Sequence, residues 1–359
     1  MRWHAVAAAV ALALLTASSC GGTDTNRLVD IGADLHGVSG LEASVYAQGL
    51  TNAAAMTFDG DGHLWVATAA YDDTGADAVY VVDSAGATPA KVIADAHTPL
   101  GLLWHDGALY VSRAGGVDVY TGFDATGSGS PTFAEHHTIV TLPDGVGEVN
   151  GLALSPEGRI SLGISAPCDS CTPTSKYAAA VVSFLPDGSD LRVDASGIRA
   201  PVGLEFFPGT DTLFVTMNQR DDLGEATPGD WLSIVKPGQS WGFPNCYGQG
   251  GTECAGTPSP VAELDQHAAV SDVAIVTGQL GTRVGTAALV AEWAKGTVLL
   301  VPLSPDGTSA TGSVRPFLTG VENPVALALD DNGALFVGDW ATGTVYRITP
   351  TSQTALTAS

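Results

Sequence analysis

The sequence predicts an all-β fold, a six-bladed β-propeller with four-stranded blades and a ring that is closed by an N-terminal strand. Two observations support this prediction: one pattern of apolar strands recurs six times, and a further strand-like segment precedes the first copy. The 359 residues include 44 glycines and 20 prolines, which agrees with frequent turns. We find no convincing amphipathic helix after residue 20, so strands and turns decide the fold class.

Each copy of the repeat has a small-residue entry, an apolar strand, an acidic or glycine turn and a second apolar strand. A third strand follows, as at residues 78–82 and 344–348. Four short antiparallel strands in each unit, repeated around a ring, are typical of a propeller. The six copies begin at Leu50, Pro99, Asn150, Pro201, Val270 and Pro324.

The two ends of the repeat region predict how the ring closes. The last unit ends after its third strand, near Ile348, and residues 43–47 form an extra strand before the first unit. Pairing these two segments completes the last blade and removes two open sheet edges. The propeller is therefore expected at residues 41–350, followed by a disordered tail at residues 351–359.

The N-terminus predicts export of the chain. Residues 1–20 combine Arg2, an apolar run too short to span a bilayer, and small residues that lead to Cys20. This segment resembles a bacterial lipoprotein signal, in which Cys20 is lipidated and anchors the protein to the cell envelope, in the periplasm or at the cell surface. The alternative is an ordinary signal peptide that leaves Cys20 as a free thiol. Residues 21–40 are rich in Gly, Thr, Asp and Ser and predict a flexible tether.

Four further cysteines form two close pairs, Cys168 with Cys171 and Cys246 with Cys254. An even number of cysteines in an exported protein favours two local disulfides. The first pair has the spacing of a metal half-site or a redox pair, but no second ligand pair has zinc-site spacing. The sequence therefore favours two disulfides.

The charge of the chain excludes several classes of partner. Lysine and arginine total 14 against 38 aspartate and glutamate residues, for a net charge of -24. Nucleic acids and anionic lipid surfaces attract basic patches, so neither is an expected partner, and contact with a membrane is expected only through the lipid anchor. No Gly-x-Ser-x-Gly elbow, His-Glu-x-x-His or Gly-rich phosphate loop is present, so nucleophilic hydrolase chemistry is unsupported.

Three central segments resemble the glucose/sorbosone dehydrogenase family. They are residues 197–204 (GIRAPVGL), 218–232 and 241–248 (WGFPNCYG), and the resemblance extends over most of residues 45–350. It implies a propeller that binds pyrroloquinoline quinone (PQQ) and calcium, oxidises a sugar or alcohol and passes electrons to an acceptor.

The resemblance also implies site residues. Its cofactor contacts fall on Arg199, Asn218, Arg220 and Lys295. Its calcium contacts are backbone oxygens near Asp222, Gly224 and Glu225. His267 matches a family position that faces the channel.

One departure from the family concerns the catalytic base. The family's base histidine falls on Gly147 and Glu148, and a neighbouring arginine falls on Asn150. Glu148 is expected to replace the base if it is partly buried, since burial raises the pKa of a carboxyl group. Otherwise Glu148 is a surface residue of a degenerate site.

Three functions therefore stay open. The first is a PQQ- and calcium-dependent sugar or aldose dehydrogenase with altered proton transfer. The second is a non-catalytic envelope propeller that binds carbohydrate or protein. The third and weakest is a calcium-dependent lactonase, with ligands supplied by Glu292, Asp339, Asn218 and Asn150. Two tryptophans, Trp293 and Trp340, are expected either to stack on a sugar or to close the channel mouth.

Overall fold

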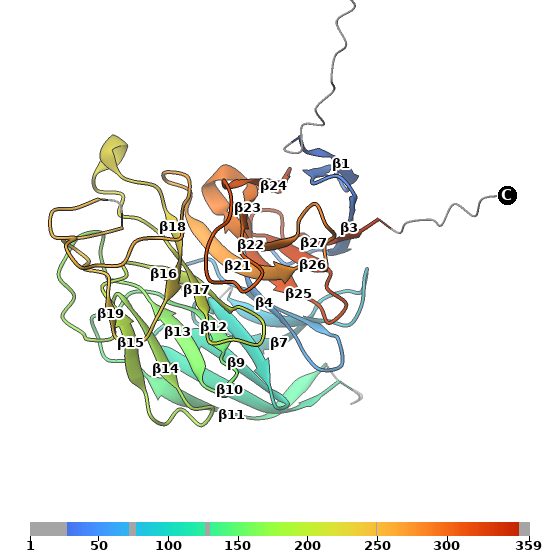
Figure 1. The fold of residues 1–359 in the computed structure, drawn as a ribbon. Coiled ribbons are helices and arrows are strands. Elements are labelled where there is room, and N and C mark those ends of the chain that lie inside the picture. The colour runs from blue at the N-terminus through green and yellow to red at the C-terminus, as the bar shows by residue number, and fades with distance from the viewer. Residues whose placement is uncertain (1–26, 72–76, 126–129, 249, 352–359) are drawn as a thin grey trace, which may run out of the picture.

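The computed structural model describes residues 27–71, 77–125, 130–248 and 250–351. Six antiparallel sheets follow one another around a central channel, which confirms the predicted six-bladed propeller (Figure 1). The first strand of each blade is innermost, and neighbouring inner strands contact one another around the whole ring. The predicted signal peptide with Cys20 and residues 352–359 of the predicted tail lie outside the described residues.

Blades 1 to 3 are built in chain order from inside to outside. Blade 1 contains β4 (Ala53–Phe58), β5 (Leu64–Thr68), β6 (Ala78–Val82) and β7 (Ala90–Ala94). Blade 2 contains β8 (Gly101–His105), β9 (Ala108–Arg113), β10 (Gly116–Asp124) and β11 (Thr132–Thr141). Blade 3 contains β12 (Val149–Leu154), β13 (Ile160–Ile164), β14 (Ala180–Phe184), β15 (Arg192–Ser196) and, at its outer edge, the parallel β19 (Gln239–Ser240).

Blades 4 to 6 complete the ring. Blade 4 contains β16 (Pro201–Phe206), β17 (Leu213–Met217), β18 (Trp231–Val235) and β20 (Ala262–Glu263). Blade 5 contains β21 (Val270–Thr277), β22 (Thr286–Glu292), β23 (Thr297–Pro302) and β24 (Arg315–Thr319). Blade 6 contains β25 (Pro324–Leu329), β26 (Leu335–Asp339), β27 (Val345–Pro350) and β3 (Leu41–Ala47).

The ring closes as the sequence predicts, because β3 forms the outer strand of blade 6. It pairs antiparallel with β27 from Ala47 opposite Val345 to Leu41 opposite Pro350 (Figure 1). The first and last strands of the propeller therefore share one sheet. Unfolding of either end must break this sheet, which joins the two ends of the repeat region.

The prediction of a flexible tether over residues 21–40 is wrong for residues 29–37. These residues form a hairpin of β1 (Val29–Gly32) and β2 (Leu35–Gly37), and β2 pairs with β24 at the outer edge of blade 5. Ile31 and Leu35 are buried in the apolar cluster that contains Phe317 and Leu318 of β24. The hairpin thus covers an edge that would otherwise expose unpaired backbone groups.

The hairpin turns between first and second strands use a repeated local chemistry. Oδ1 of Asp59 and Oδ1 of Asp330 each accept hydrogen bonds from the backbone N–H groups two and four residues later. Gly62 and Gly333 follow with positive φ angles of 86° and 79°, which glycine adopts without strain. These short-range interactions explain why the turns are readable from the sequence.

Buried hydroxyls at the ends of second strands join neighbouring blades. Oγ of Ser112 donates to the carbonyl of Asn150 across the contact of blades 2 and 3 (2.6 Å). Oγ1 of Thr216 donates to the carbonyl of Ser271 across blades 4 and 5 (2.6 Å). These bonds satisfy polar groups that face the packed interior and set the register of one blade against the next.

Within the described residues, no helix is long and apolar enough to cross a membrane. The only helical elements there are two single-turn 3₁₀ segments, η1 (Gly224–Ala226) and η2 (Trp293–Lys295). Both lie at the end of the channel where the first strands begin.

Removal of a buried side chain from β3 should destabilise the ring. Tyr46 is buried, and its ring meets Phe336 of β26 edge to face with centroids 4.8 Å apart. Tyr46→Ala is expected to lower the free energy of unfolding by about 3 kcal/mol through loss of apolar contact and creation of a cavity. Urea unfolding followed by circular dichroism measures the change. The control is Val45→Ala on the same strand, where the side chain is 44% exposed; equal effects of the two substitutions would contradict the expectation.

Candidate functional site

A cavity of 590 Å³ opens at one end of the channel, where the inner strands begin and the second strands end. We call it the mouth cavity. Its described lining comes from blades 1, 3, 4, 5 and 6. A second cavity of 310 Å³ continues along the channel. Five residues line both cavities: Tyr71, Asn150, Val202, Ser271 and Val325.

One side of the mouth cavity is aromatic. Trp293, Trp340 and Tyr71 line it from blades 5, 6 and 1, which are neighbours in the ring. The rings of Trp293 and Trp340 meet edge to face with centroids 6.0 Å apart, and Nε1 of Trp340 donates to the carbonyl of Ala69. Tyr71 was missed in the sequence, although it follows the second strand of its blade as the two tryptophans follow theirs.

The position of the family's base histidine is changed in shape and charge. A Cβ atom at Gly147 would lie 2.3 Å from the carbonyl oxygen of Ala166, so this position has no room for a side chain. Glu148 lines the mouth cavity but is exposed, so the burial on which its predicted role depended is not found. Asn150 is buried, and its Nδ2 donates to the carbonyl of Pro201 (2.8 Å), which ties blade 3 to blade 4.

Two predicted cofactor contacts, Arg199 and Asn218, do line the mouth cavity. Nη1 of Arg199 donates to the carbonyl of Asn218 (3.2 Å), and Nη2 is paired with the carboxylate of Asp169. Nε of Arg199 and Oδ1 of Asn218 are buried without a hydrogen-bond partner among the described residues. Such orphaned polar atoms at a cavity wall are rare in folded proteins and indicate a place for a polar ligand.

His267 lines the mouth cavity, and both of its ring nitrogens face acceptors. Nδ1 lies 2.8 Å from Oδ1 of Asp221, and Nε2 lies 3.1 Å from the carbonyl oxygen of Gly224. The imidazolium form donates to both acceptors at once, so these contacts favour it. The hydrogen bond to Asp221 is the main reason that the pKa of His267 lies above its usual value.

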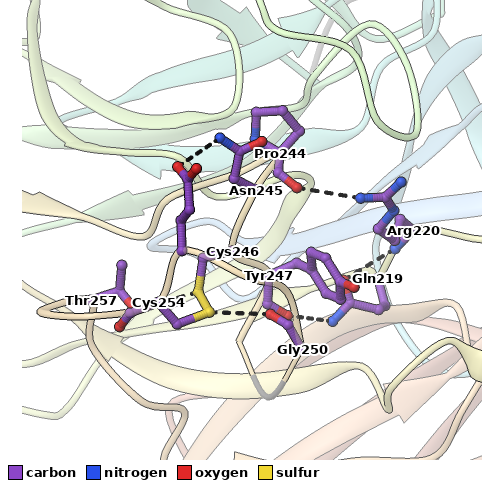
Figure 2. Close-up of a disulfide and its surroundings, with 10 residues drawn as sticks. Gln219, Arg220, Pro244, Asn245, Cys246, Tyr247, Gly250, Cys254 and Thr257 are labelled. Atoms are coloured by element: carbon purple, nitrogen blue, oxygen red, sulfur yellow. Dashed lines mark hydrogen bonds between the residues drawn. A yellow bond between two sulfur atoms is a disulfide. The ribbon is translucent and has the colours of Figure 1, made fainter.

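The other two predicted cofactor contacts do not belong to the described lining of the mouth cavity. Nε and Nη2 of Arg220 each lie 2.6 Å from an oxygen of Asp222, and Nη1 donates to the carbonyl of Pro244 (Figure 2). The guanidinium also lies over the ring of Tyr247, 5.0 Å from its centroid. Lys295 is exposed on η2.

The loop expected to bind calcium is occupied by internal contacts. The carbonyl of Gly224 accepts a hydrogen bond from the backbone N–H of Thr227 and lies 3.1 Å from Nε2 of His267. Asp222 is held by Arg220, whose hydrogen bonds lower its pKa to about 2, and Glu225 is exposed. Among the described residues, no three or more His, Cys, Asp or Glu side chains are grouped to hold a metal.

Both predicted disulfides are present. Cys168 bonds Cys171 in the loop between β13 and β14, and Cys246 bonds Cys254 beside Tyr247 (Figure 2). The first disulfide loop lies next to the mouth cavity, because its Asp169 contacts Arg199. The sequence could not place this contact, since loop and arginine belong to different hairpins.

Of the four lactonase ligands, Asn150 and Asn218 belong to the described lining of the mouth cavity, and Glu292 and Asp339 do not. Oδ1 of Asp339 accepts hydrogen bonds from the backbone N–H groups of Asn323 and Ala341, so its role is to hold the local turn. Glu292 is fully buried, and its Oε1 accepts from the N–H of Asp265 (3.2 Å), whereas its Oε2 has no partner among the described residues. Burial is the main reason that the pKa of Glu292 is raised to about 8.

The channel cavity below carries two further carboxyl groups. Glu205 of β16 and Asp272 of β21 line it from neighbouring blades. Oδ2 of Asp272 accepts from the N–H of Leu327, which joins blades 5 and 6 (3.0 Å). Desolvation inside the ring raises the pKa of the half-buried Asp272 to about 7. Glu205 lies in the same cavity with its side chain exposed to the channel.

Comparison with solved structures shows that the fold is shared with sugar-oxidising enzymes. A Trichoderma reesei carbohydrate-active enzyme of family AA12 matches with a TM-score of 0.73 and 20% identity, over 91% of this chain and 100% of that chain. The PQQ-bound aldose sugar dehydrogenase from Streptomyces coelicolor matches with a TM-score of 0.68 and 18% identity, over 87% and 99%. The holo form of the pyranose dehydrogenase PQQ domain from Coprinopsis cinerea matches with a TM-score of 0.70 and 18% identity, over 88% and 97%.

Sequence comparison adds no closer relative. Neither the models of protein families nor the curated proteins gave a match to this sequence. At identities of 20% or less, the structural matches establish the fold, and the function must be argued from the site. The chain is thus a six-bladed propeller with the fold of the soluble PQQ-dependent sugar dehydrogenases.

The charge on His267 can be tested by titration. We expect its pKa to lie above the usual value of about 6.5, and Asp221→Asn to lower it, since the main stabilising hydrogen bond to the imidazolium is then weakened. Histidine-selective NMR across pH 5–9 measures both values. The control is Asp144→Asn, which removes an exposed carboxylate elsewhere. A pKa in the wild type at or below that of Asp221→Asn would contradict the assignment.

Glu292 should make stability fall as the pH rises. Its folded-state pKa of about 8 lies above its unfolded value of about 4.5, so the folded state binds more protons than the unfolded state between these two pH values. The stability of the protein therefore falls as the pH rises through this range. Glu292→Gln removes the titration and keeps an acceptor for the N–H of Asp265. In urea unfolding, we expect the free energy of unfolding of the variant to exceed that of the wild type by about 2 kcal/mol at pH 8 and by less at pH 5.

The control for Glu292 is Glu157→Gln, which removes an exposed glutamate at the β12–β13 turn. It changes the net charge by the same amount but leaves the buried site intact. If both variants show the same pH profile, net charge rather than the buried carboxyl group governs the effect.

Proposed function

We propose that this chain binds a neutral sugar or sugar alcohol in the mouth cavity, as a binding propeller exported to the cell envelope. The observation that carries the proposal is the two-sided cavity, with an aromatic wall of Tyr71, Trp293 and Trp340 and polar groups from blades 3 and 4. A sugar presents an apolar ring face and a rim of hydroxyls, so it matches both sides at once.

The polar side offers hydrogen bonds suited to hydroxyl groups. Glu148 and Oδ1 of Asn218 are acceptors, and Nε of Arg199 is a donor without a partner among the described residues. A hydroxyl donates and accepts, so it pairs with either kind of group. The volume of 590 Å³ lies within the range of small-molecule sites, roughly 300–1,000 Å³.

The lining is a poor electrostatic match for PQQ, which is a tricarboxylate. The cations on the described lining, Arg199 and His267, are each paired with a carboxylate. Glu148 and Asp230 add further carboxyl groups to that lining. An anionic cofactor would enter a site with more carboxyl groups than cations, so we derive no chemistry through it.

Oxidation of a sugar with PQQ and calcium is the competing function, and the fold of the matched dehydrogenases favours it. It would require an electron acceptor in addition to the sugar. The envelope location rests on residues 1–20 and on lipidation of Cys20, and it belongs to the proposal for either function.

Tryptophan fluorescence gives a direct test, because two cavity residues are indoles. We expect neutral aldoses and alditols to change the emission of the domain in a saturable way. Trp293→Ala should weaken binding by about tenfold through loss of a stacking surface. Trp104→Phe is the control, since Trp104 stacks on Trp65 outside the mouth cavity. Absence of saturable binding for all tested sugars would refute the proposal.

A second experiment on the same protein distinguishes sugar binding from sugar oxidation. After incubation with calcium and micromolar PQQ, we expect the protein to show no absorbance from bound cofactor. We also expect no dye reduction when aldoses are added. Tight cofactor binding with aldose-dependent dye reduction would establish the dehydrogenase instead. In that case a sharp loss of turnover in Glu148→Gln would identify Glu148 as the base.

A further inference from the structure

The pair of Arg199 and Asp169 occupies a place where a ligand's anionic group would be expected to bind. Arg199 lines the mouth cavity with its side chain 18% exposed, and its Nη2 is paired with the carboxylate of Asp169. A guanidinium at a cavity wall is well shaped to bind a carboxylate or a phosphate. Here the protein supplies that carboxylate itself.

The carboxylate comes from a loop that is held by a disulfide and by a hydrogen bond. Asp169 lies between Cys168 and Cys171, whose disulfide closes a loop of four residues. The neighbouring Ser170 hydrogen-bonds Asp222, which in turn holds Arg220. A short closed loop keeps Asp169 close to Arg199 at a high effective concentration, so an external anion competes at a disadvantage.

The remaining contacts of Arg199 also favour a neutral ligand over an anion. Nη1 donates to the carbonyl of Asn218, so the only nitrogen without a partner among the described residues is Nε. The Nε–H and the second N–H groups of Nη1 and Nη2 each suit a hydroxyl, whereas a carboxylate is bound best by two parallel donors of a guanidinium whose charge is not already paired. With Asp169 in place, Arg199 is therefore presented to the cavity as a neutral hydrogen-bonding group.

We propose that Asp169 determines the charge selectivity of the mouth cavity. By neutralising Arg199 it makes the cavity accept neutral sugars and reject sugar acids and other carboxylates. This inference rests on the proposed function, which it extends by naming the excluded ligands and the residue that excludes them. Glu148 on the same lining adds repulsion against anions.

The test compares two variants that each remove one negative charge. Asp169→Asn removes the internal carboxylate. Asp61→Asn is the matched control, because Asp61 is exposed on the β4–β5 turn, at the opposite end of β5 from Tyr71. Circular dichroism and thermal melting show that each variant is folded before binding is measured.

Two sugar probes differ only in charge: D-glucuronate carries a carboxylate, and D-glucuronamide carries a neutral amide of the same shape. In the wild type and in Asp61→Asn, glucuronamide should bind more tightly than glucuronate by about tenfold. In Asp169→Asn this preference should disappear, mainly through tighter binding of glucuronate. Calorimetry measures the affinities.

PQQ serves as an anionic probe that does not depend on sugar binding, and its absorbance reports the bound fraction. We expect Asp169→Asn to bind it at least about tenfold more tightly than Asp61→Asn does. A double variant, Cys168→Ser with Cys171→Ser, should shift both readouts in the same direction by a smaller factor, because the loop that holds Asp169 is then open. This second variant keeps the test informative if Asp169→Asn does not fold.

The outcomes separate the two proposals. If no protein binds either sugar probe, the proposed function fails, and the affinities for PQQ still decide the role of Asp169. If the glucuronamide preference and the PQQ affinity are the same in Asp169→Asn and Asp61→Asn, the role of Asp169 is overturned, whether or not sugars bind.

Discussion

The pairing of β3 with β27 is the constraint on which the rest of the structure depends. The outer strand of the last blade comes from the N-terminal end of the repeat region, so the pairing of β3 with β27 holds both ends of the propeller in one sheet. Because the ring is closed, the ends of the inner strands are held at fixed positions around one channel. The mouth cavity is assembled from loops of five blades, so its shape follows directly from this closure.

The chemistry of the cavity is set by charge pairs that form within the protein. Arg199 is paired with Asp169, and His267 with Asp221. A cation that is already paired gains little from a new anion, since the old pair must first be broken. In the site that we propose, this pairing leaves the cavity polar without attracting anions, which suits a neutral, hydroxylated ligand.

The fold and the site depend on different features of the sequence. The blades depend on apolar strands and on turn residues such as Asp59 and Asp330, which many sequences supply. The site depends on single side chains. At Gly147 the carbonyl of Ala166 leaves no room for a base, and Asn150 serves as a link between blades. A shared propeller is therefore compatible with a different use of its channel mouth.

Local patterns in the sequence determined the six repeats, the closing strand and the two disulfides, because each depends on residues close together in the chain or on a periodicity of two. The resemblance to the glucose/sorbosone dehydrogenase family pointed to Arg199, Asn218 and His267, which line the mouth cavity. The tertiary structure alone decided what depends on distant partners. The supposed tether pairs with β24, and Asp169 reaches Arg199 from another hairpin. Such contacts follow from the placement of blades around the ring, which no local pattern encodes.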